Sequence, residues 1–116
     1  MVGDDAARAA AARDAATTWG QVVVLKGART VIASPDGQIA VAPFENPALA
    51  TGGTSDVLAG AIGSLLAQGL KPFDAARLGV YLHGLAGDIA AEKLSQEAMI
   101  SCDIINSMGY AFKRII

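Results

Sequence analysis

A short run of apolar, mostly β-branched residues, Gln21 to Leu25, constrains the fold of this 116-residue chain more than any other sequence feature. The run lies between Gly20 and Gly27, and after Gln21 it is apolar on both of its faces. Such a strand is typical of the interior of a sheet whose two faces are both covered, usually by helices. The run therefore predicts a buried strand in an α/β fold.

The rest of the chain supplies a hairpin and several helices. In chain order the pattern predicts a helix over 4–19, strands over 21–25, 30–34 and 39–42, and helices over 54–68, 72–93 and from 101 to the C-terminus. The second and third strands form a hairpin, because Pro35-Asp-Gly37 is a strong turn sequence. Helices this apolar usually cover a larger sheet, so the set of strands looks incomplete. A small sheet or self-association would also satisfy the pattern.

Composition narrows the class of protein. The chain has 24 Ala and 13 Gly, which predicts a core built by close approach of backbones. Its net charge of −2 argues against a nucleic-acid partner, which usually meets a basic face. The longest apolar run, 57–70, is too short to span a membrane. The single cysteine, Cys102, excludes an internal disulfide and a cysteine-rich zinc site. We expect a soluble cytoplasmic protein.

The first candidate site is a glycine-rich segment that leads into the helix predicted over 54–68. The first amides of a helix have no partner within the helix, and the helix dipole is positive there. Glycines at that point allow a close backbone approach to a phosphate or a developing oxyanion. Asp56 follows in the first turn, where a carboxylate could serve as a general acid or base. The predicted anion hole consists of Gly52, Gly53, Thr54 and Ser55.

A simpler interpretation of this segment is an ordinary capped helix. Thr54 or Ser55 would then cap the first turn, Asp56 would favour the dipole, and the glycines would only form a turn. The segment is not a Walker P-loop, because no Gly-Lys-Ser/Thr follows, and it has no Gly-x-Gly-x-x-Gly pattern.

The second candidate site, Lys26 to Thr30, follows the predicted buried strand. Ligands collect at strand ends in open α/β sheets, and Lys26 and Arg29 suit the phosphates of a nucleotide. The alternative is two solvated charges in a turn. His83, which lies among small and apolar residues, is predicted to be a hydrogen-bonded packing residue.

The segments Val22–Gly37, Asn46–Gly60 and Leu78–Asp88 together resemble one family, the ADP/ATP-dependent NAD(P)H-hydrate dehydratases. The resemblance covers nearly all of residues 8–116, and the Gly-Gly-Thr-x-Asp element is shared with the wider ribokinase-like superfamily. It implies the C-terminal part of a three-layer α/β/α fold, with one short central strand, a β-hairpin and three helices. Residues 1–116 would then form the C-terminal half of a nucleotide-binding domain whose N-terminal half is absent.

The resemblance also implies a reaction. Family members repair nicotinamide cofactors: the (6S) hydrate of NADH or NADPH is dehydrated while ADP becomes AMP, normally with Mg²⁺. Asp56 matches the residue at the hydrate substrate and would be the catalytic acid or base. The residues implied in nucleotide binding are Lys26, Gly27, Ala28, Arg29, Thr30 and Ser55.

Two departures from the family pattern bear on activity. The family usually has glycine where this chain has Ser55, and family domains are more than twice as long. We therefore expect the isolated chain to be inactive and to form a homo-oligomer through surfaces that the absent half would cover. Two further hypotheses remain: a ribokinase-like sugar or vitamin kinase, and a non-catalytic fragment that self-associates.

Overall fold

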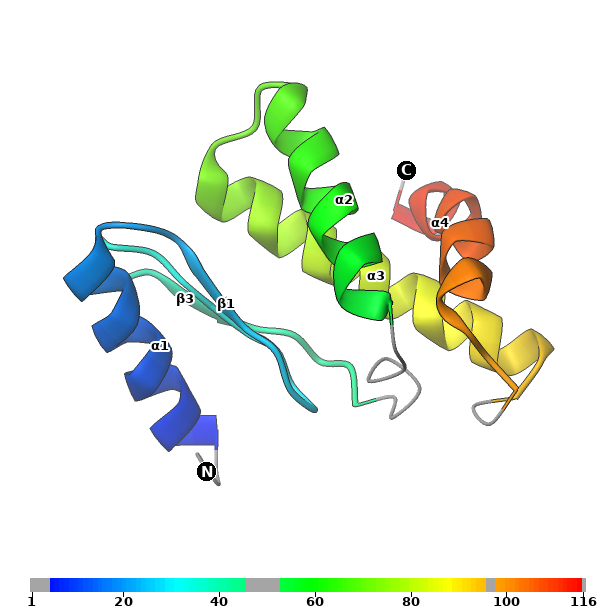
Figure 1. Cartoon of the computed structure of the whole chain (residues 1–116), viewed down its shortest axis with the longest axis horizontal. Helices are drawn as coiled ribbons and strands as arrows, with labels where there is room; N and C mark the ends of the chain where they lie inside the picture. The colour runs from blue at the N-terminus through cyan, green and yellow to red at the C-terminus, as the bar shows by residue number, and fades with distance from the viewer. Residues whose placement is uncertain (1–4, 46–52, 96–97, 116) are drawn as a thin grey trace.

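The computed structural model describes residues 5–45, 53–95 and 98–115. Its elements are α1 (Asp5–Trp19), β1 (Val23–Leu25), β2 (Val31–Ala33), β3 (Ile39–Val41), α2 (Thr54–Ala67), α3 (Pro72–Lys93) and α4 (Ser101–Ile115). Helix α1 lies on one side of the sheet, α2 and α3 lie on the other, and α4 packs against α3 (Figure 1). The predicted α/β/α layering is confirmed.

The sheet has the order β1-β2-β3, and both pairs of neighbouring strands are antiparallel. Ile32 in β2 stands opposite Val24 on one side and Ala40 on the other. All three residues of β2 are buried, whereas β1 is only half-buried. The sequence prediction that 21–25 is the buried strand is therefore corrected: β2 has a paired strand on each side, and β1 pairs only with β2 among the described strands.

The hairpin between β2 and β3 forms as predicted. The Gly37 N–H donates to the Ser34 carbonyl oxygen at 3.1 Å, and the Ser34 N–H donates to the Gln38 carbonyl oxygen at 2.9 Å. The Asp36 carboxylate accepts hydrogen bonds from the Ser34 hydroxyl and from the Gln38 N–H, so the side chains of the turn also hold it closed. A three-residue loop of this kind is a common hairpin connection.

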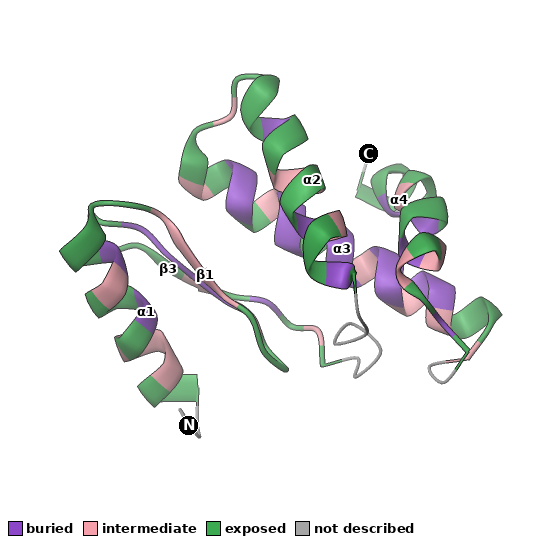
Figure 2. Ribbon diagram, in the orientation of Figure 1, coloured by how far each residue is buried: buried purple, intermediate pink, exposed green. Residues whose placement is uncertain are grey.

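Strand β2 separates two layers of the core, because its side chains alternate between the two faces of the sheet. Val31 and Ala33 pack against Ala12 and Ala16 of α1. Ile32 faces the opposite way, into a cluster with side chains of β3, α2 and α3. Both layers are buried (Figure 2). The alanines of α1 bring its backbone close to the sheet, as the composition predicts.

The three C-terminal helices share a third cluster of apolar side chains. Helix α3 is its centre, since it contacts both α2 and α4 and carries most of the buried helical residues. Gly79 lies at the crossing with α2, where an added Cβ would stand 2.6 Å from Ile62 Cγ1 and 3.4 Å from the Ile62 Cα. The α2–α3 contact therefore needs a residue without a side chain at position 79.

Glycine and proline mark the helix ends that the sequence predicts. Helix α1 is followed by Gly20, and the Gln21 N–H donates to the Ala16 carbonyl at 3.3 Å. Helix α2 is followed by Gly69, and the Leu70 N–H donates to the Leu65 carbonyl at 3.2 Å. Each of these two hydrogen bonds is the 6→1 bond that is typical of a Schellman motif at a helix C-terminus. The predicted helices over 54–68 and 72–93 are confirmed to within one residue.

The helix crossing gives a stability prediction. Replacing Gly79 by Ala introduces a methyl group that overlaps Ile62, and overpacking of this kind typically costs about 1–3 kcal/mol. Gly63→Ala is the matched control, because Gly63 lies in the exposed face of α2 with nothing near an added Cβ. Both variants gain about 1 kcal/mol of helix propensity. We expect urea unfolding to rank Gly63→Ala above Gly79→Ala in free energy of unfolding by about 1–3 kcal/mol; equal values would contradict the close approach.

Candidate functional site

A hydrogen bond joins the two sites predicted from the sequence. Lys26 directly follows β1, and Ser55 lies in the first turn of α2. The Lys26 Nζ donates to the Ser55 Oγ at 2.7 Å. Both side chains are exposed, so the ammonium group and the hydroxyl remain reachable from solvent. The fold thus places the charged end of one segment at the positive end of a helix 29 residues further along the chain.

The N-terminus of α2 is open rather than capped by a side chain. Its cap residue is Gly53, which has a left-handed backbone with φ of 87° and makes no side-chain cap bond. An added Cβ on Gly53 would also stand 3.0 Å from the Ser101 Oγ. Asp56 is exposed in the first turn. The cap residue is therefore Gly53 and not Thr54 or Ser55; Gly52 lies outside the described residues.

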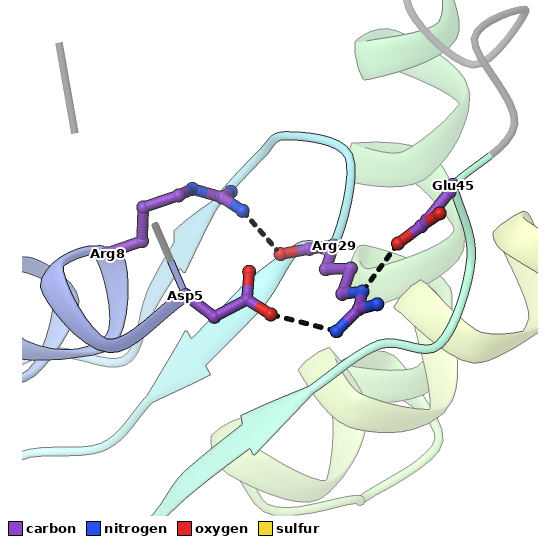
Figure 3. Close-up of polar contacts among 4 residues, drawn as sticks. All are labelled: Asp5, Arg8, Arg29 and Glu45. Atoms are coloured by element: carbon purple, nitrogen blue, oxygen red, sulfur yellow. Dashed lines mark hydrogen bonds and ion pairs between the residues drawn. The ribbon is translucent and has the colours of Figure 1, made fainter. Parts of the chain in front are cut away.

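Arg29 is held by two carboxylates that lie far from it in the sequence. Its Nε donates to Glu45 Oε1 at 2.6 Å, and its Nη1 donates to Asp5 Oδ2 at 2.9 Å (Figure 3). The hydrogen bond and charge of Glu45, followed by the charge of Asp5, raise the pKa of Arg29. The local sequence around Arg29 is free of acids, so neither partner was predicted.

Arg8 of α1 fixes the backbone of the loop from Lys26 to Thr30. It donates to the Arg29 carbonyl oxygen at 2.8 Å (Figure 3) and to the Leu25 carbonyl oxygen at 3.2 Å. The guanidinium lies against Gly27, and an added Cβ there would overlap it. Gly27 is thus needed for Arg8 to reach the two carbonyls. Nothing distinguishes Arg8 from Arg13 of the same alanine-rich helix in the sequence, so this role has no sequence signal.

His83 lies beneath the open end of α2. It is 4% exposed, and its imidazole forms a hydrogen bond with the Thr54 backbone. Burial and then the charge of Lys26 lower the pKa of His83, while the Thr54 bond opposes them. The prediction of a buried histidine is confirmed, although its Nε2 has no hydrogen-bond partner among the described residues; its place near Lys26 and the α2 N-terminus could not be read from its neighbours in sequence.

Two hollows lie side by side at the end of β3 and the residues after it, and one of them reaches Arg29. One, of about 490 Å³, is lined by Arg29, Val41, Ala42, Pro43 and Glu45. The other, of about 320 Å³, shares Val41, Ala42 and Pro43 and extends between the sheet and α3 towards Tyr81. The first is more polar and the second is mostly apolar. Together they offer a charged end and an apolar floor to a ligand that reaches the strand end.

In the parts of the chain that the structure describes, no three His, Cys, Asp or Glu side chains gather in a way that could hold a metal ion. None of the described helices combines the length and the hydropathy that a membrane span requires.

Known proteins resemble this chain closely. It is 51% identical over 100 residues to the bifunctional NAD(P)H-hydrate repair enzyme of Moorella thermoacetica, covering 86% of this chain and 19% of that protein. It is 52% identical over 85 residues to the ADP-dependent (S)-NAD(P)H-hydrate dehydratase of Neisseria meningitidis, covering 73% of this chain and 29% of that one. The ADP/ATP-dependent NAD(P)H-hydrate dehydratase of Bacillus subtilis, co-crystallised with ATP and Mg²⁺, superposes with a TM-score of 0.89 at 36% identity, covering 94% of this chain and 39% of that one.

The layered fold and the glycine-capped helix end define a chain of the ribokinase-like class. The sequence model of the NAD(P)H-hydrate dehydratase family matches residues 1–109, and the chain belongs to that family. It spans less than a third of the length of the two curated relatives named above.

The environment of His83 predicts a pH-dependent stability. Its pKa is lowered in the folded state from the ordinary value of 6.5, so between these two pKa values the unfolded chain binds more protons. The free energy of unfolding should therefore fall as the pH drops below about 6.5, by at most about 1.4 kcal/mol per pH unit.

The matched variant His83→Asn removes this titration and keeps a side-chain N–H donor. Urea unfolding of both proteins at a series of pH values isolates the histidine, because the carboxylates are common to both. The difference between them should depend on pH in the window just below 6.5. A constant difference across that window would show that His83 titrates normally.

Proposed function

We propose that this chain supplies the nucleotide site and the catalytic carboxylate of an ADP-dependent dehydratase that acts on the (6S) hydrate of NADH or NADPH. The observation that carries the proposal is the 2.7 Å bond between Lys26 and Ser55, directly beside Asp56. One relative is named as an ADP-dependent (S)-NAD(P)H-hydrate dehydratase and the other as an NAD(P)H-hydrate repair enzyme, which favours this reaction over the phosphorylation of a sugar or vitamin.

The phosphates of ADP would bind between Lys26 and the first turn of α2. Lys26 contributes a compact positive charge, the Ser55 hydroxyl contributes a hydrogen bond, and the N-terminal amides of α2 contribute donors and the positive dipole end. Ser55 stands at a position that is usually glycine in this family, and its bond to Lys26 points to a second role: it orients the ammonium group. The remaining donors of the predicted anion hole would come from Gly52, Gly53 and Thr54.

Arg29 would contact the nucleotide from the opposite side, with Gly27, Ala28 and Thr30 forming the loop beneath it. Its present partners Asp5 and Glu45 are exposed, and exposed ion pairs contribute little to stability. Replacing one of these carboxylates by a phosphate as the partner of Arg29 therefore costs little free energy. The apolar hollow that extends towards Tyr81 would receive the base of the nucleotide.

Mg²⁺ would arrive with the nucleotide. The described residues hold no cluster of acidic ligands, and Mg²⁺ in phosphate chemistry is usually bound by the phosphates, waters and one or two carboxylates. The phosphates and waters would supply most of its ligands, which leaves the exposed Asp56 carboxylate in the first turn of α2 for the hydrate. The ion would neutralise phosphate charge.

Asp56 would act on the hydroxyl group of the hydrate. It accepts the hydroxyl proton as the oxygen attacks the β-phosphorus of ADP, and the bond between that phosphorus and the bridging oxygen breaks to release AMP. The phosphorylated hydrate then loses inorganic phosphate and a ring proton, which restores the nicotinamide double bond. The sum is hydrate plus ADP giving NAD(P)H, AMP and phosphate.

We also propose that residues 1–116 form the C-terminal half of the nucleotide-binding domain. In support, β1 has an unpaired edge among the described strands, and the chain covers 39% of the Bacillus subtilis dehydratase. Large apolar side chains are exposed, among them Trp19, Val41, Ile105 and Tyr110, which suits a covering half or a second copy. A homo-oligomer, a cytoplasmic location and inactivity of the isolated chain stay predictions.

The nucleotide site is tested by calorimetric titration with ADP and Mg²⁺. Lys26→Ala removes a charge-assisted hydrogen-bond donor worth about 1.5–3 kcal/mol, so we expect roughly 10- to 100-fold weaker binding. The control is Lys71→Ala, which removes one exposed charge at the start of α3, beyond the far end of α2. The control should bind as the parent does. Equal losses in both variants would refute a specific role for Lys26.

The chemical role of Asp56 needs a turnover assay. In the longer protein that we propose carries this chain, Asp56→Asn should keep ADP binding within about threefold, because the amide has the size of the carboxylate. It should reduce formation of NADH from its hydrate by at least about 100-fold, since a general base is lost. Unchanged turnover would exclude Asp56 as the base.

A further inference from the structure

One guanidinium group of α1 holds both ends of the segment from Lys26 to Arg29. The Arg8 Nη1 donates to the Arg29 carbonyl oxygen at 2.8 Å (Figure 3), and its Nη2 donates to the Leu25 carbonyl oxygen at 3.2 Å. These two carbonyls belong to the peptide units through which the chain enters and leaves the segment. Because the guanidinium is rigid and planar, its two terminal nitrogens set how far apart the two carbonyls lie.

Strand pairing does not determine the conformation of this segment. Leu25 and Val31 form the last pair between β1 and β2, and residues 26–30 between them belong to neither a helix nor a strand. The directions of the Lys26 and Arg29 side chains therefore depend on how the connecting backbone is held. Arg8 holds it from a different layer of the molecule.

Glycine at position 27 leaves room for this group. A Cβ added to Gly27 would lie 2.6 Å from the Arg8 Cζ, so the guanidinium occupies the space that a side chain would need. Gly27 does not have a positive φ, and the backbone there suits any residue. The contact with Arg8, and not backbone strain, is what favours glycine at this point of the loop.

Resting on the proposed function, we propose that Arg8 is a positioning residue for the nucleotide phosphates: by binding two carbonyls of the loop, it holds Lys26 and Arg29 in place before ADP arrives. Arg8 acts through the loop backbone and does not touch the ligand. A loop that is ordered beforehand loses less conformational entropy on binding, which raises affinity.

Backbone ¹⁵N relaxation gives the first test, and it needs no nucleotide. In Arg8→Ala we expect the order parameters of the Ala28 and Arg29 amides to fall from the rigid range near 0.85 towards the flexible range below about 0.6. The matched control is Arg13→Ala, which removes the same charge from an exposed position of the same helix. The control should keep the parent values; parent values in Arg8→Ala as well would overturn the proposal.

Nucleotide affinity gives the second test. With ADP and Mg²⁺, we expect Arg8→Ala to bind about 3- to 10-fold more weakly and Arg13→Ala to bind as the parent does. Arg8→Lys separates geometry from charge, because lysine keeps the charge but lacks the rigid fork. Its affinity should lie closer to that of Arg8→Ala than to that of the parent. Parent affinity in Arg8→Lys would show that only the charge matters and would contradict positioning.

Gly27→Ala tests the same contact from the side of the loop, since it displaces the guanidinium and leaves α1 unchanged. In that background Arg8→Ala should change ADP affinity by less than about twofold, because the contact is already lost. An equal loss in both backgrounds would contradict the proposal.

The outcomes remain decisive if one protein fails. If Arg8→Ala does not fold, the order parameters of Gly27→Ala and Arg8→Lys replace it, and parent values in both would overturn the proposal. If the parent itself fails to bind ADP, the proposed function is wrong, while the order parameters still decide whether Arg8 holds the loop.

Discussion

Strand β2 cannot present either face to water, and the arrangement of the molecule follows from that constraint. Val31 and Ala33 need α1 on one side, and Ile32 needs α3 on the other. Once both helices are in place, α1 brings Arg8 under the loop after β1, and α3 supports the first turn of α2. The candidate site thus lies where three structural layers meet.

The sequence predicts the elements of this fold well and their arrangement less well. Glycine and proline mark helix ends because their backbone chemistry acts locally, which is why α3 begins at Pro72 and α2 ends before Gly69 as predicted. The exposure of the strands depends on neighbours instead. Val23–Leu25 and Val31–Ala33 are equally apolar, and nothing in either segment states which one lies in the centre of the sheet.

The residues of the candidate site, like the fold, could be predicted only in part from the sequence. Lys26 and Ser55 were predicted because each lies in a segment with recognisable phosphate chemistry, although their direct contact was not. Arg8, Asp5 and Glu45 were missed, since they reach the loop from α1 and from the residues after β3. Their roles depend on contacts that form only in the folded chain, so the charge pattern along the sequence does not predict them.

The central claim is that the end of β1 and the start of α2 form one phosphate site. Amide chemical-shift mapping of the ¹⁵N-labelled chain during titration with ADP and Mg²⁺ tests it most directly. The account predicts that the largest shifts fall together at Lys26–Thr30 and Gly53–Asp56 and saturate with one dissociation constant. It would be contradicted if one of these segments stayed unmoved at saturation, or if the largest shifts fell in the hollow between α3 and α4, around Ile89 and Tyr110.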